Sequence, residues 1–208
     1  ALSWGAYLNA TEDNSDGTVT VTTSGVEDGQ TVTIVLGGVT DTGSVSSNSA
    51  TVTIAASDLD ALADGAHTMT VNVSDAAGNA ATQVTSSSFT ADATAPTVSS
   101  ISMNDTALKS GDTATLTIVF SEAVTAFANA DLTIPNGTLT NVATGDNITW
   151  TATYTPTADV TDTTNVISVA TSYTDLAGNA GGTGQTANFT IDTAAPSISA
   201  VGTGALSW

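Results

Sequence analysis

One stretch of this sequence occurs twice, 100 residues apart. Residues 74–100 read SDAAGNAATQVTSSSFTADATAPTVSS, and residues 174–200 read TDLAGNAGGTGQTANFTIDTAAPSISA. The two copies share the motifs D-x-A-G-N, F-T-x-D and A-P at matching positions. Self-similarity at a fixed spacing is the signature of repeated modules. Because the sequences upstream of the two copies differ, we expect two related but distinct modules, A and then B.

The tetrapeptide ALSW stands both at residues 1–4 and at residues 205–208. If both mark the same position of module A, the chain holds one A–B period and the start of the next A. The expected domains are residues 1–94 (module A without its leading strand), residues 95–194 (module B) and residues 195–208 (the first strand of the next module A). We expect residues 195–208 to lie free of module B, or to pair as an added strand with module A of a neighbouring molecule.

Apolar residues alternate with threonine through most of the chain, which is the pattern of half-buried β-strands. Clusters of Gly, Asn and Asp interrupt these runs and predict turns at short intervals. We therefore expect an all-β chain of two tandem immunoglobulin-like antiparallel β-sandwiches, arranged as an extended rod. A short helix is expected at 57–65, with Ser57 as its cap and Asp60 as the reciprocating acid. The expected strands are 17–23, 30–36, 50–55, 67–73, 113–120, 147–155 and 165–171.

The charge balance is strongly one-sided, with 20 Asp and Glu residues against one Lys or Arg, for a net charge of −19. A basic patch is impossible, so nucleic acid and anionic membrane surfaces are poor partners, and we expect no nucleic-acid binding. Cysteine is absent from the sequence, which removes disulfides and thiolate metal sites. No apolar run reaches transmembrane length, so we expect no membrane insertion in this segment. A folded chain with this net charge repels itself, and cations bound from solution would reduce that repulsion.

Strand order in an immunoglobulin-type sandwich predicts which acidic loops meet. The linker before a module, the loop after its second strand and the loop before its last strand lie at one end. Carboxylates and carbonyls that converge from several loops are the oxygen ligands of calcium, which takes about six to eight of them. The alternative is that these acidic turns are merely solvated. The candidate ligands at this end are Asp92, Glu122, Asp175 and Asn179 for module B, and Glu27, Asp75 and Asn79 for module A; at the opposite end of module A they are Asp13 and Asp16.

Catalytic residue patterns are scarce. A Ser–His–Asp triad would have to use His67, the only histidine, and no G-x-S-x-G stretch is present. His67 begins a predicted strand, where a structural hydrogen bond is the expected role. Trp150 and Tyr154 share one face of a predicted strand and are expected in the core. We therefore expect no enzymatic activity.

Three motifs together resemble a known family. Residues 118–124 read IVFSEAV, and they combine with D-x-A-G-N and F-T-x-D-x-x-A-P. The set resembles the bacterial immunoglobulin-like tandem repeats of giant repeats-in-toxin adhesins, which are exported by type I secretion and act in biofilm formation or attachment. Module B matches from about Ser99 to Pro196, and module A resembles a sister repeat. Module A departs from the pattern, with VEDGQ in place of FSEAV, so Glu27 stands in a different motif from Glu122.

The resemblance implies an extender region on the bacterial cell surface, in which many sandwiches in series hold a ligand-binding tip away from the cell. It implies a monomeric rod whose partners are the neighbouring repeats of the same chain and calcium ions at the linkers. By the family pattern, Asp92 and Asp192 in the linkers, Asp75 and Asp175 in the D-x-A-G-N motifs, and then Glu122 are the ligands. The alternative function is a binding module that recognises a surface glycan or protein.

Overall fold

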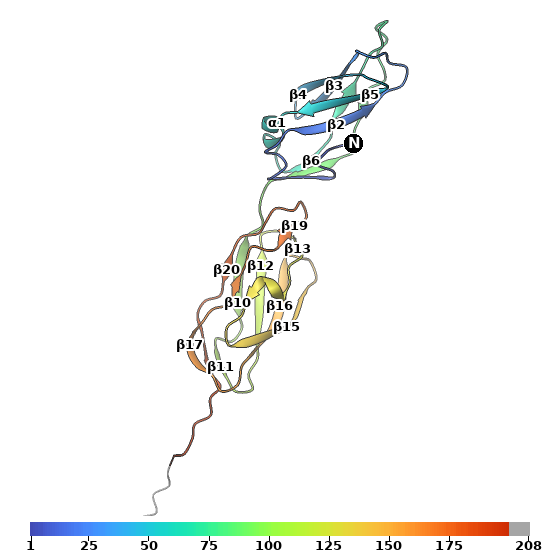
Figure 1. The fold of residues 1–208 in the computed structure, drawn as a ribbon. Helices are drawn as coiled ribbons and strands as arrows, with labels where there is room; N and C mark the ends of the chain where they lie inside the picture. The colour runs from blue at the N-terminus through green and yellow to red at the C-terminus, as the bar shows by residue number, and fades with distance from the viewer. Residues whose placement is uncertain (200–208) are drawn as a thin grey trace, which may run out of the picture. The chain divides into compact units, whose positions relative to one another are not determined.

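The computed structural model describes residues 1–199, and they form two compact units that are built almost entirely from short strands (Figure 1). The first unit comprises residues 1–96 together with 174–180, and the second comprises 97–173 and the chain from 181 onward. Both units are immunoglobulin-like β-sandwiches, so the predicted fold class is confirmed. The domain boundaries proposed from the sequence stay a prediction. No helix in the described part of the chain is long and apolar enough to cross a membrane.

The first unit contains three sheets, with strand orders β4-β3-β7-β8, β2-β5 and β1-β9-β6. Threonine and valine alternate along β2, β3 and β5, so each strand presents one apolar face to the core. The core includes Trp4, Leu8, Ile34, Val52 and Phe89. The elements are β1 (Tyr7–Asn9), β2 (Gly17–Thr22), β3 (Thr31–Leu36), β4 (Val39–Ser44), β5 (Ser49–Ile54), α1 (Ala56–Asp60), β6 (Gly65–His67), β7 (Thr70–Asn72), β8 (Val84–Thr85) and β9 (Phe89–Asp92).

The second unit contains the sheets β10-β12-β16-β15, β11-β21-β17 and β14-β18-β20. Its core includes Leu116, Phe120, Tyr154, Tyr173 and Phe189. The elements from residue 97 onward are β10 (Val98–Met103), β11 (Ala107–Lys109), β12 (Ala114–Phe120), β13 (Val124–Thr125), η1 (Asn129–Asp131), β14 (Leu132–Thr133), β15 (Gly137–Thr144), β16 (Thr149–Pro156), β17 (Thr161–Asn165), β18 (Ser168–Val169), β19 (Thr174–Asp175), β20 (Gly184–Gln185) and β21 (Phe189–Asp192).

The two units repeat the same strand pairing at the same spacing. Strand β1 runs parallel to β9 with Tyr7 opposite Thr90, and β11 runs parallel to β21 with Ala107 opposite Thr190. Each residue of the second pair lies 100 positions after its counterpart in the first. The repeat found in the sequence is therefore a repeat of backbone pairing, and positions 100 residues apart can be compared directly.

Two of the predicted strands are interrupted in the structure. The predicted strand 67–73 is broken: β6 pairs with β9 and β7 pairs with β3, so the chain changes sheets between them. Met69 sits at the break, with a buried side chain and its N–H donated to Ser86 Oγ (2.9 Å). Residues 165–171 likewise divide between β17 and β18. In both places, alternate side chains stay buried or partly buried through the change of sheet, so the sequence pattern predicts a single strand.

The helix is shorter than expected and is capped differently. It spans Ala56–Asp60, and no side chain caps it from the preceding residue Ala55. Ser57 lies inside the first turn, where it cannot serve as the cap. The N–H of Ala56 instead donates to Asp16 Oδ1 (3.0 Å), a carboxylate from the loop before β2. A cap from a distant loop leaves no local sequence signal.

His67 and the two aromatic residues of β16, Trp150 and Tyr154, have structural roles. His67 Nε2 lies 2.7 Å from the carbonyl oxygen of Ala63, which fits the expected structural hydrogen bond. Tyr154 is fully buried and its hydroxyl donates to the carbonyl oxygen of Pro135 (2.7 Å). Trp150 packs against the same core. Residues 195–199 lie outside any strand, and Ile198 is 87% exposed, while the rest of the predicted strand 195–208 lies outside the described residues.

Candidate metal centre

The D-x-A-G-N motif folds into a tight turn around its own carboxylate. Asp175 Oδ1 accepts hydrogen bonds from the N–H groups of Gly178 (2.7 Å) and Asn179 (2.9 Å), and Asp175 Oδ2 accepts one from Asn179 Nδ2 (2.7 Å). Gly178 has φ +97°, a conformation that side chains rarely adopt, so the motif requires glycine there. Aspartate favours such turns because its side chain bonds the backbone a few residues ahead. The turn holds Asp175 at 2% exposure in one orientation.

Asn179 connects this turn to two other segments of the first unit. Its Nδ2 donates to the carbonyl oxygen of Asp92 (2.7 Å), and its Oδ1 accepts from the N–H of Ala10 (2.9 Å). Asn9 Nδ2 donates to the carbonyl oxygen of Ala177 (3.0 Å). Asn9 and Ala10 were not predicted from the sequence, because nothing in L-N-A-T marks them as partners of a turn about 170 residues away.

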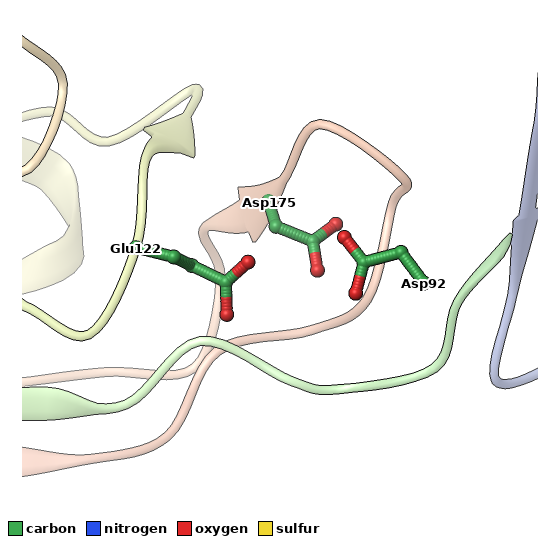
Figure 2. Close-up of side chains that lie close together, drawn as sticks. All are labelled: Asp92, Glu122 and Asp175. Carbon is green, nitrogen blue, oxygen red and sulfur yellow. The ribbon is translucent and has the colours of Figure 1, made fainter. Parts of the chain in front are cut away.

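Three carboxylates gather beside this turn. One oxygen from each of Asp92, Glu122 and Asp175 lies within 4.8 Å of the others. Figure 2 shows the Asp92 and Asp175 carboxylates turned toward each other, with Glu122 approaching Asp175 from the other side. Asp92 ends β9, Glu122 follows β12, and Asp175 ends β19, so the group comes from three separate parts of the sequence. The structure thus brings together three of the predicted residues, with Asn179 bonded to two of them.

The electrostatics of the group favour a bound cation. Burial raises the pKa of Asp92, and the nearby charge of Asp175 raises it further. Both effects penalise the ionised carboxylate unless a positive charge compensates. The whole sequence supplies one Lys or Arg, so compensation from the chain is scarce. Carboxylate oxygens held near one another are hard ligands of the kind that calcium prefers, with carbonyls or water to complete the set.

The same motif in the first unit forms the same turn with fewer acids. Asp75 accepts hydrogen bonds from the N–H (2.7 Å) and Nδ2 (2.8 Å) of Asn79, and Glu27 Oε2 accepts from the N–H of Ala76 (2.9 Å). The Asn79 side-chain bond is the largest cause that lowers the pKa of Asp75. Glu27, Asp75 and Asn79 therefore lie together, as expected. Among residues 1–199, no third carboxylate lies as close to Glu27 and Asp75 as Asp92, Glu122 and Asp175 lie to one another.

The remaining predicted ligands lie elsewhere. Asp13 is buried, and burial followed by the charge of Asp60 raises its pKa. Asp16 accepts the hydrogen bond that caps α1. Asp192 ends β21, and its Oδ1 accepts from Thr161 Oγ1 (3.0 Å). None of these three belongs to the cluster of Asp92, Glu122 and Asp175.

Comparison with known proteins agrees with this architecture. Residues 92–191, which include all three clustered acids, match the family model of a bacterial Ig-like domain. Among curated proteins, none matches significantly. One similar solved structure comes from a 1.5-MDa bacterial ice-binding adhesin, and it was studied for how that adhesin is retained on the host cell surface. It is 26% identical to this chain, with a TM-score of 0.53. The match covers 90% of this chain and 61% of that one.

A second structure belongs to a Ca2+-stabilized adhesin that helps an Antarctic bacterium reach out and bind ice. It is 27% identical with a TM-score of 0.51, over 93% of this chain and 48% of that chain. A bacterial immunoglobulin-like domain from the M. primoryensis ice-binding adhesin is 36% identical over 42% of this chain and 86% of that domain, with a TM-score of 0.32. This chain thus spans about three fifths of the first structure and about half of the second.

Both of the first two relatives are described as bacterial adhesins, and neither description names an enzymatic activity. The predicted resemblance to the bacterial Ig-like repeats of large adhesins is therefore confirmed, and it agrees with the expectation of a non-enzymatic chain. Residues 92–191 match the bacterial Ig-like domain family, and the similar solved structures that span most of the chain come from bacterial adhesins.

Proposed function

We propose that this chain is a calcium-stiffened spacer of a large bacterial surface adhesin, in which Ig-like repeats in series project a ligand-binding tip from the cell. The observation that carries the proposal is the cluster of Asp92, Glu122 and Asp175, whose carboxylate oxygens lie within 4.8 Å of one another. A related adhesin is described as Ca2+-stabilized, which supports calcium as the ion.

The donor set fits calcium. Asp175 is buried and already accepts three hydrogen bonds, so its orientation does not depend on an ion. The pKa of Asp92 is raised by burial and by Asp175, which identifies a carboxylate that gains from a nearby cation. Asp92, Glu122 and Asp175 would hold the ion, and carbonyl oxygens or water would supply the remaining ligands. The ion would neutralise the cluster and fix the start of the matched domain at Asp92 to the two acidic loops.

The turn at Asp75 and Asn79, with Glu27 beside it, would form part of an equivalent site that a preceding segment completes. Asp192, which lies 100 positions after Asp92, would serve the following repeat in the same way. Asp13 and Asp16 would at most contribute single oxygens. Calcium would then occur at each junction of a series, which is what a uniform spacer requires.

Calcium also supplies a mechanism for export. Bound calcium stabilises the fold by RT ln(1 + [L]/Kd), about 1.4–2.7 kcal/mol per site at roughly ten to a hundred times Kd. A domain of ordinary stability, about 5–15 kcal/mol, is strongly affected by several such sites. An acidic chain would stay loosely folded at the low calcium of the cytosol and would stiffen at the higher calcium outside the cell.

The test is calorimetric titration of the chain with calcium, together with thermal unfolding in calcium, magnesium and chelator. We expect calcium to bind and to raise the melting temperature, and Asp175→Asn to remove most of both effects. Asp159→Asn is the matched control, because Asp159 is exposed and its φ of +57° suits asparagine. An identical melt in calcium and chelator would rule out the calcium mechanism.

Small-angle scattering in the same buffers tests whether calcium stiffens the chain, and unchanged scattering curves would rule out the spacer role.

A further inference from the structure

The segment that follows Asp92 is held by a carboxylate from another loop. Asp64 stands directly before β6, and its Oδ1 accepts a hydrogen bond from the N–H of Ala93 (2.9 Å), while its Oδ2 accepts one from the hydroxyl of Thr94. Both oxygens of Asp64 therefore bond the two residues that come directly after Asp92. The Thr94 bond, followed by the Ala93 bond, holds the pKa of Asp64 below its ordinary value, because both favour the ionised carboxylate.

Thr94 passes this constraint on to the carboxylate of Asp92. The N–H of Thr94 donates to Asp92 Oδ1 (3.3 Å), in the kind of turn that aspartate forms with the backbone two residues ahead. The hydroxyl and the N–H of Thr94 thus bond two different carboxylates, Asp64 and Asp92. The orientation of the Asp92 side chain is therefore linked to Asp64 through one residue.

Asp64 lies near the acidic cluster but outside it. The carboxylates with oxygens within 4.8 Å of one another are those of Asp92, Glu122 and Asp175. Burial raises the pKa of Asp92 most, and the charges of Asp175 and then Asp64 raise it further, so Asp64 is close enough to affect Asp92. Its two oxygens are directed at the backbone and hydroxyl of residues 93 and 94.

The second unit has a different group at the matching place. The pairing of β6 with β9, extended by one residue, sets Asp64 opposite Asp92. In the second unit Thr161 pairs with Asp192, and its Oγ1 donates to Asp192 Oδ1 (3.0 Å). The hydroxyl there bonds the aspartate carboxylate itself. Asp64 instead bonds the residues beyond Asp92, whose carboxylate is turned toward the cluster (Figure 2).

We propose that Asp64 is a positioning residue of the calcium site, which orients the Asp92 carboxylate through Thr94. The inference rests on the proposed function, because it assigns a role toward the same ion. A ligand that is already oriented loses less freedom when the ion binds, so calcium affinity depends on Asp64 although Asp64 does not contact the ion. Replacing a residue that orients a metal ligand typically lowers metal affinity by about 10–100-fold.

The test is calorimetric titration of the full chain and its variants with calcium. Asp64→Ala removes both bonds to residues 93 and 94 and should weaken calcium binding at least about tenfold. Thr94→Val removes the hydroxyl without changing the charge and should also weaken binding, and it should add less than about twofold to Asp64→Ala, since both act along one path. Thr94→Ser keeps the hydroxyl and is the matched control. Asp64 and Thr94 are both exposed, so these variants leave the core intact.

Asp64→Asn separates position from charge. Asparagine keeps an oxygen for the Ala93 N–H and a nitrogen that can donate to the Thr94 hydroxyl, so calcium affinity should stay within about threefold of the parent chain. Affinity as low as that of Asp64→Ala, with Thr94→Val unchanged, would overturn the proposal, because Asp64 would then act through its charge or as a ligand. A parent chain that binds no calcium overturns the proposed function as well. A parent that binds calcium, with variants that bind it equally well, overturns the role of Asp64 alone.

Hydrogen exchange in chelator tests the bonds of Asp64 without calcium. The N–H of Ala93 should be protected in the parent chain, and Asp64→Ala should raise its exchange rate at least about tenfold. Asp60→Ala is the control, because Asp60 is an exposed acid that ends α1 four residues earlier, and it should leave the rate within about twofold. An Ala93 exchange rate that does not respond to Asp64→Ala would overturn the proposal.

Discussion

The side chain of Asn179 holds the backbone of Asp92, through a 2.7 Å hydrogen bond from its Nδ2 to the Asp92 carbonyl oxygen. The same amide bonds the Asp175 carboxylate and accepts the N–H of Ala10. Asn179 thus fixes one member of the acidic cluster by its backbone and another by its carboxylate. One side-chain amide therefore contacts both aspartates of the cluster.

Replacing Asn179 should therefore lower the free energy of unfolding more than replacing its counterpart Asn79 in the first unit. Asn179→Ala leaves the Ala10 N–H, the Asp92 carbonyl and one Asp175 oxygen without these bonds, and we expect a loss of about 1–3 kcal/mol in the free energy of unfolding. Asn79→Ala is the control, because Asn79 is exposed and its side chain bonds Asp75. Chemical denaturation measures both. Equal losses for the two variants would contradict the role given to Asn179.

Asp92→Asn should have opposite effects with and without calcium. In chelator, the variant removes a carboxylate whose ionisation is penalised by burial and by Asp175, so its melting temperature should equal or exceed that of the parent chain. In calcium, it removes a ligand, so its melting temperature should fall. A change of 1 kcal/mol corresponds to about 4–8 °C for a domain of this size. A variant that is less stable by the same amount in both buffers would show that Asp92 has only a structural role.

Asp146 should make stability depend on pH. Hydrogen bonds from the N–H groups of Thr149 (2.8 Å) and Ile148 (2.9 Å) hold the pKa of Asp146 below its ordinary value. A lowered folded-state pKa gives stability that is present above the unfolded-state pKa and is lost as pH falls through the folded-state value. The difference in melting temperature between the parent chain and Asp146→Asn should therefore shrink on acidification. The measurement is a series of melts from neutral pH down through the carboxyl range, and a constant difference would contradict the assignment.

Gly181 should not tolerate a side chain. A Cβ at this position would lie 2.1 Å from the ring of Tyr173, which is fully buried. Gly181→Ala should destabilise the second unit by about 1–3 kcal/mol, because the core must shift to admit the methyl group. Gly145→Ala is the control in the same unit, since a Cβ there meets open space. Calorimetry should show a lower transition for Gly181→Ala and little change for the control.

The sequence by itself determined the repeat, the all-β fold and the residues that could form an acidic site. These follow from local chemistry: threonine and valine alternate at the period of a strand, and D-x-A-G-N encodes a turn in which aspartate bonds the following backbone. The 100-residue spacing placed the same turn in both modules. Strand order was enough to predict that the segments carrying Asp92, Glu122 and Asp175 would meet.

Tertiary structure alone decided the partners that come from distant segments. Asp16 caps α1 from a loop 40 residues away, and Asn9 bonds the carbonyl of Ala177. The changes of sheet after His67 and Asn165 also leave no mark in the alternating pattern, because buried residues continue through them. Hydrogen bonds across such separations depend on where two segments are brought together in space, and no local preference in the sequence encodes that position.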